Sequence, residues 1–239
     1  MRARLVAFIV VLAVLGGISP GAIIYDLGQV PPPDGNSLTE VNAAGGIWVG
    51  DKLFTSFTVD CARTVGVVPQ GLDEIYVHGV EVNGDYGLIF TGSWSAFSGQ
   101  TADSTITFKV TASEGYLIKD NGLKLLGCSA ENGGSIIITE NIYPGDPKTS
   151  QWIGDKIVYY RTFSDGTTFV KQEDHADFTP LREIWVVKDV GVTGGIDAGG
   201  VAHLSQFQQT FSQIPEPATL ALLALGGLAL LRRRRRHRA

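Results

Sequence analysis

The chain of 239 residues contains only two cysteines and one methionine, and it has few basic residues between its two ends. Eight of its 19 lysines and arginines lie at the extreme termini. Residues 22–214 therefore hold eleven basic and 23 acidic residues, a formal charge of −12. An acidic surface repels the phosphates of nucleic acids and of anionic lipids. We therefore expect no nucleic-acid partner.

The sequence also lacks the short motifs by which common active sites are found. It has no Gly-x-Ser-x-Gly elbow, no His-Glu-x-x-His zinc motif and no phosphate-binding glycine loop. A glycoside hydrolase needs a pair of carboxylates in one cleft, and no motif singles out such a pair among the acidic residues. We therefore expect a protein that is not an enzyme, with a polysaccharide-active hydrolase as one alternative.

Apolar runs of bilayer-spanning length are absent, and the two longest uncharged segments of mostly apolar residues lie at the ends. The first, residues 5–18, follows Arg2 and Arg4 and precedes small residues and Pro20. This is the layout of a secretory signal peptide, and 14 residues are fewer than the ~20 that span a bilayer. We predict a signal peptide at residues 1–21, with Sec-type export machinery and signal peptidase as partners. A retained N-terminal anchor is the alternative.

The second uncharged segment, residues 218–231, predicts a short transmembrane helix followed by a basic tail. Because positively charged flanks stay in the cytoplasm, both ends of the chain are expected there and the body is expected outside. The basic cytoplasmic cluster consists of Arg232, Arg233, Arg234, Arg235, Arg236 and Arg238.

Directly before this helix stand Pro215, Glu216 and Pro217. The Pro-Glu-Pro triplet, the apolar helix and the arginine-rich tail together cover about the last 25 residues. In this order they resemble the PEP-CTERM sorting signal of Gram-negative, exopolysaccharide-producing bacteria. The resemblance implies processing by an exosortase, a membrane-embedded Cys protease or transpeptidase. It implies an inner-membrane-anchored precursor and a mature form at the cell surface or in the biofilm matrix. A plain tail anchor is the alternative.

The body, residues 22–212, reads as a single all-β domain. Short segments rich in β-branched and aromatic residues alternate with glycine, aspartate and asparagine clusters such as Asn121-Gly122, which predict turns. In residues 104–111, Ile106, Phe108 and Val110 share one face of the predicted strand. We predict an antiparallel, jelly-roll-like β-sandwich, with the signal helix and the transmembrane helix outside it. A barrel or a β-helix is the alternative.

Two groups of residues could bind or cross-link within the body. Cys61 and Cys128 form a possible disulfide, since an exported protein meets oxidising conditions; two free thiols are the alternative. Asp174, His175 and Asp177 could ligate a structural Ca²⁺ or a softer metal, while a solvated acidic loop explains the same residues. We expect no other cofactor.

Aromatic residues raise the possibility of carbohydrate binding, because sugar rings stack on exposed aromatic faces. Trp94 and Trp152 stand in glycine-, serine- and proline-containing contexts that predict exposed loops. The first hypothesis is thus an exported structural or interaction protein. A carbohydrate-binding module that contacts extracellular polysaccharide is the second.

Overall fold

The computed structural model describes residues 22–25, 35–62, 65–69 and 71–216. The predicted signal peptide, the predicted transmembrane helix, Pro217 and the basic tail lie outside these residues. Within the described part of the chain, no helix has both the length and the hydropathy to cross a membrane.

The described residues form two β-sheets and one short helix, α1 (Leu38–Ala43). The eight-stranded sheet contains, in spatial order, β1 (Ile23–Tyr25), β3 (Ile47–Val49), β4 (Lys52–Cys61), β7 (Thr101–Ala112), β13 (Glu183–Thr193), β9 (Ser135–Tyr143), β10 (Gly154–Thr162) and β11 (Thr168–Lys171). The six-stranded sheet contains β12 (Glu173–Leu181), β8 (Tyr116–Glu131), β14 (Val201–Pro215), β6 (Asp85–Phe97), β5 (Tyr76–Val82) and β2 (Asn36–Ser37).

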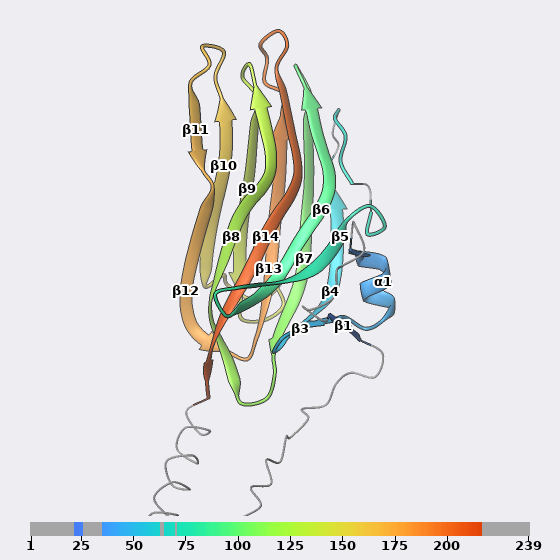
Figure 1. Ribbon diagram of the computed structural model, residues 1–239, viewed down its shortest axis with the longest axis vertical. Helices are drawn as coiled ribbons and strands as arrows, with labels where there is room; N and C mark the ends of the chain where they lie inside the picture. The colour runs from blue at the N-terminus through green and yellow to red at the C-terminus, as the bar shows by residue number, and fades with distance from the viewer. Residues whose placement is uncertain (1–21, 26–34, 63–64, 70, 217–239) are drawn as a thin grey trace, which may run out of the picture.

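The two sheets pack face to face, which confirms the predicted all-β sandwich at the level of its two layers (Figure 1). Strand pairing is antiparallel except between β1 and β3. Ile106, Phe108 and Val110 are fully buried, as their alternation predicts. Phe90 of β6 meets Phe108 of β7 across the layers, with 5.6 Å between ring centroids.

Two local predictions were wrong. Asn121-Gly122 is not a turn, because both residues lie inside β8, where they pair with Ala176 and His175 of β12. The acidic segment around His175 is not a loop but the edge strand β12. In both places, pairing with a neighbouring strand outweighs the local preference for a turn.

The last strand, β14, continues three residues past the predicted domain end at residue 212. Pro215 pairs with Tyr116 of β8, and the backbone N–H of Glu216 donates to the Gly115 carbonyl over 2.8 Å. In Figure 1 this end of β14 lies at the same lower end of the sandwich as β1.

Candidate functional site

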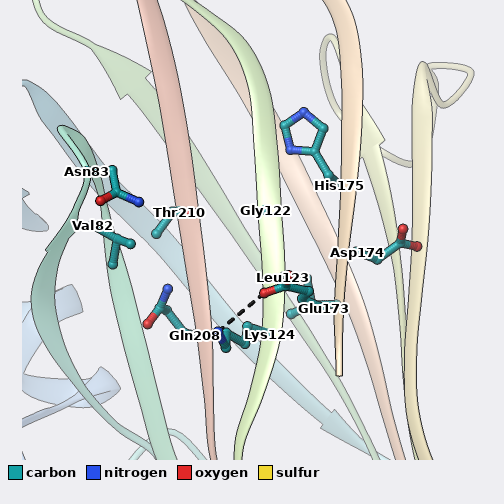
Figure 2. A pocket seen from close by; sticks show the side chains of 10 residues that line it. All are labelled: Val82, Asn83, Gly122, Leu123, Lys124, Glu173, Asp174, His175, Gln208 and Thr210. Atoms are coloured by element: carbon teal, nitrogen blue, oxygen red, sulfur yellow. Dashed lines mark ion pairs between the residues drawn. The ribbon is translucent and has the colours of Figure 1, made fainter. Parts of the chain in front are cut away.

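The outer face of the six-stranded sheet carries a groove of about 510 Å³, hereafter the polar groove (Figure 2). Strands β12, β8 and β14 form its floor and the β5–β6 turn its far wall. Lys124 and Glu173 stand opposite each other in the β8–β12 register, and their side chains pair over 3.3 Å. Its lining is Val82, Asn83, Gly122, Leu123, Lys124, Glu173, Asp174, His175, Gln208 and Thr210, which offers hydrogen-bonding groups and no Phe, Tyr or Trp ring.

The predicted metal ligands divide between two faces of β12. His175 and Asp177 lie two residues apart on one face and join Asp120 of β8, with ligand atoms within 4.8 Å of one another. His175 Nε2 lies 3.2 Å from an Asp177 carboxylate oxygen. Sequence reasoning missed Asp120 because only the β8–β12 register places it opposite Asp177.

Asp174 has a different role from the one predicted. Its carboxylate accepts the backbone N–H of Ile157 over 2.9 Å and pairs with Lys171 over 2.7 Å. Burial opposes its ionisation, but these hydrogen bonds outweigh burial and lower the pKa of Asp174. Figure 2 shows this carboxylate pointing away from the His175 ring. Asp174 therefore links edge strand β12 to β10 at Ile157, beyond the part of β10 that pairs with β11.

A second groove, of about 260 Å³, lies on the outer face of the eight-stranded sheet over β9, β10 and the β10–β11 hairpin. We call it the aromatic groove; it is lined by Ser135, Ile137, Tyr159, Arg161, Phe163 and Phe169. The Phe163 and Phe169 rings meet edge to face with centroids 5.7 Å apart, and Arg161 lies over Phe163 at 4.5 Å. Phe169 is 58% exposed. Exposed rings beside a guanidinium suit a ligand with both apolar faces and hydroxyl groups.

The prediction that Trp94 is exposed was wrong. Trp94 lies inside β6, is completely buried, and donates its indole N–H to Ser104 Oγ over 2.7 Å. Its glycine and serine neighbours belong to the strand rather than to a loop, so this ring is a core residue and presents no face to a glycan. Trp152 is exposed, as expected, at 57%.

The predicted disulfide is absent, and both cysteines are free thiols. Cys61 ends β4 in one sheet, where its thiol lies 2.7 Å from the Pro69 carbonyl oxygen, while Cys128 lies in β8 of the other sheet. Burial raises the pKa of both thiols, which disfavours the reactive thiolate.

Charged residues also lie between the sheets, at positions that sequence reasoning missed. Glu140 of β9 stands opposite Lys156 of β10 on one side and Lys188 of β13 on the other. All three side chains are fully buried and in contact. The signal was present in the sequence, since each of them occupies the inward position of an alternating apolar strand, as Glu140 does between Ile138 and Ile142.

Comparison with known proteins identifies the C-terminal segment. Residues 213–236 match the PEP-CTERM protein-sorting motif, so the chain carries this sorting signal. Pro215 and Glu216 are therefore both the end of the β14 segment and the start of the signal. No curated protein matches the chain.

Solved structures similar to this chain include carbohydrate-binding modules. One is TmCBM61 in complex with β-1,4-galactotriose, at 13% identity over 67% of this chain and 88% of that one, with a TM-score of 0.27. Another is a structure described under the promiscuous specificity of carbohydrate-binding modules from the β-sandwich superfamily, at 13% identity over 78% of this chain and 65% of that one, with a TM-score of 0.29. A third is CBM28, a module specific for non-crystalline cellulose, at 16% identity over 77% of this chain and 98% of that one, with a TM-score of 0.23. At these TM-scores no residue role is transferred to this chain.

Proposed function

We propose that this protein is an exported, jelly-roll-like β-sandwich that an exosortase processes through its C-terminal signal for display at the cell surface or in the extracellular matrix. The observation that carries the proposal is the PEP-CTERM motif at residues 213–236. The strand order also fits, because β6, β14, β8 and β12 face β7, β13, β9 and β10, and the chain alternates between the layers from β6 to β9 and again from β11 to β14.

The junction between domain and signal supports this sequence of events. β14 delivers Pro215 in extended conformation, and Glu216 is held by one backbone hydrogen bond to Gly115. Proline lacks a backbone N–H donor, so the Pro-Glu-Pro motif donates no further hydrogen bond to β8 from its two prolines. A processing enzyme therefore meets an extended segment at the end of a folded domain.

Mass spectrometry of the exported protein tests the proposal. We expect a mature chain without residues 1–21 and without the segment that follows the Pro-Glu-Pro motif, and we expect accumulation of precursor in the inner membrane when Pro215, Glu216 and Pro217 are changed to alanine. Pro144→Ala with Pro147→Ala, in the β9–β10 loop, is the matched control and leaves processing intact. A mature protein that still ends at Ala239 would contradict the proposal.

A second function, polysaccharide binding without catalysis, is supported by the aromatic groove. Tyr159, Phe163 and Phe169 offer ring faces, and Arg161 offers donors for hydroxyl groups. Sorting by an exosortase to the cell surface or matrix would bring this groove into contact with extracellular polysaccharide. The polar groove, without a Phe, Tyr or Trp ring, is the weaker candidate for stacking.

Affinity electrophoresis in the bacterium's own exopolysaccharide tests this function. We expect Phe169→Ala to weaken retardation about fivefold, since a stacked ring contributes on the order of 1 kcal/mol. Phe97→Ala is the matched control, because Phe97 is similarly exposed, at 59%, and lies outside the groove. Equal retardation of both variants and the native chain would rule out the groove. Release of reducing sugar would instead favour the hydrolase alternative.

A further inference from the structure

The buried cluster between the sheets contains the complete set of groups for an amide-forming reaction. Asn121 of β8 enters from the six-stranded sheet, and Lys156 and Glu140 enter from the eight-stranded sheet. Lys156 Nζ contacts both Asn121 Oδ1 and Glu140 Oε1. Asn121 Nδ2 in turn donates to Glu140 Oε1 over 2.7 Å. One carboxylate thus touches the amine and the amide nitrogen together.

We propose that Lys156 and Asn121 join through an intramolecular isopeptide bond, with Glu140 as the catalytic residue. The Lys156 Nζ lone pair attacks Asn121 Cγ, so an Nζ–Cγ bond forms and the Cγ–Nδ2 bond breaks. Glu140 first takes the ammonium proton of Lys156, which frees this lone pair, and then takes the second proton that Nζ loses after the attack; it delivers both, one after the other, to Nδ2, which leaves as an ammonium ion. The products are a secondary amide and an ammonium ion, with Glu140 returned to its ionised form. No oxidant or cofactor takes part.

The surroundings favour each step. Lys156 and Glu140 are buried to 2% exposure or less and Asn121 is fully buried, so water does not compete for the amide carbon. Burial is the main cause that lowers the pKa of Lys156, and a lower pKa makes the neutral, nucleophilic form of the amine easier to populate. The sheets hold the three groups in contact before reaction, which replaces an encounter by a fixed geometry.

Charge balance gives the reaction a driving force. Before reaction, Lys156 and Lys188 share the single carboxylate of Glu140, an excess of one positive charge in an interior of low dielectric constant. Amide formation removes the Lys156 charge and leaves Glu140 paired with Lys188 alone. The Lys188 ammonium remains 5.7–6.0 Å from the ring centroids of Phe90, Phe108 and Phe207.

A second pair in the cluster is less well placed. Lys188 contacts Gln209 Oε1 and Glu140, but Gln209 Nε2 lies 3.3 Å from Glu140 Oε1, against 2.7 Å for Asn121 Nδ2. Proton delivery to the leaving nitrogen is therefore better aligned for Asn121. The assignment rests on this difference.

Peptide mass spectrometry of the purified full-length chain tests the bond. After reduction and complete tryptic digestion, residues 120–124 are expected covalently joined to residues 149–161, with Lys156 uncleaved and a mass lower than the sum of the two peptides by one ammonia, about 17 Da. We expect Glu140→Gln, which keeps the shape but removes the base, and Lys156→Met to yield the two segments separately.

Lys52→Met is the matched control and keeps the cross-linked peptide. Lys52 is equally buried and contacts an amide oxygen, on Gln213, but its carboxylate partner is Asp51, in the turn between β3 and β4. Circular dichroism checks that each variant is folded. Separate peptides 120–124 and 149–156 from the native chain would overturn the proposal without any variant. A cross-link between Lys188 and Gln209 instead would overturn the choice of residues.

Discussion

The interior of the sandwich holds an aromatic cluster and a charged row that meet at one side chain. The aromatic cluster consists of Phe54, Phe57, Phe90, Phe108, Phe207, Phe211 and Trp94, in which each ring contacts at least one other. The charged row is Lys156, Glu140 and Lys188, and Lys188 reaches the rings. The ring contacts are spread over seven pairs, so no single ring makes all of them, whereas both lysines have Glu140 as their carboxylate partner. The charged row is therefore the more sensitive to a single substitution.

Glu140→Ala is expected to have the largest effect. It leaves two buried ammonium groups without their carboxylate, a loss of about 5 kcal/mol of unfolding free energy. Urea unfolding followed by circular dichroism measures it. Glu183→Ala is the control, since Glu183 pairs with Lys109 over 3.2 Å at the surface with 46% of its side chain exposed. Similar losses for both variants would show that burial of the row adds nothing.

Trp94→Ala comes next, with an expected loss of about 4 kcal/mol. The substitution opens a cavity beside Phe207 and leaves Ser104 Oγ without its indole donor. The same unfolding experiment measures the loss. A change below about 1 kcal/mol would mean that the aromatic cluster closes around the gap.

The charged row is also expected to make stability depend on pH. Burial, opposed by Glu140 and reinforced by Lys156, lowers the pKa of Lys188 from 10.5 to about 8. The unfolded chain therefore holds this proton more tightly, and the free energy of unfolding rises with pH between about 8 and 10.5.

Lys188→Met should reduce the slope of the native chain by about 1 kcal/mol per pH unit. Unfolding curves at a series of pH values measure the slope. Lys124→Met is the control, because 42% of the Lys124 side chain is exposed and it pairs with Glu173. A slope in Lys188→Met equal to that of the native chain would assign the titration to another group.

Trp152→Ala is expected to have the smallest effect, within about 0.5 kcal/mol, because a mostly exposed ring buries little area. Both variants replace a tryptophan by alanine, so the difference between their losses measures the effect of burial. A loss approaching that of Trp94→Ala would show that Trp152 packs in solution.

Most strands follow from residue alternation in the sequence, and the exceptions share one cause. Asn121-Gly122 has the composition of a turn, yet Asn121 is held inside β8 by contacts with Glu140 and Lys156, residues distant in sequence. The polar segment at β12 becomes a strand because β8 offers it an open edge. Such partners come from the tertiary fold and leave no trace in a local window.

The candidate sites were less accessible to sequence reasoning. The sorting signal is contiguous, so its residues identified it directly. The aromatic groove joins Ile137 to Phe169 across β9, β10 and β11, and the charged row joins three strands, so both depend on register. Trp94 was misjudged because its small neighbours belong to a buried strand.

The position of β14 has a mechanical consequence for a protein held by its C-terminal end. β14 is hydrogen-bonded to β6 along one side and to β8 along the other, and these bonds run across the strand direction. A pull along β14 therefore loads both ladders in shear, with many bonds sharing the force at once. Unzipping, in which bonds break one after another, would require a pull from the side.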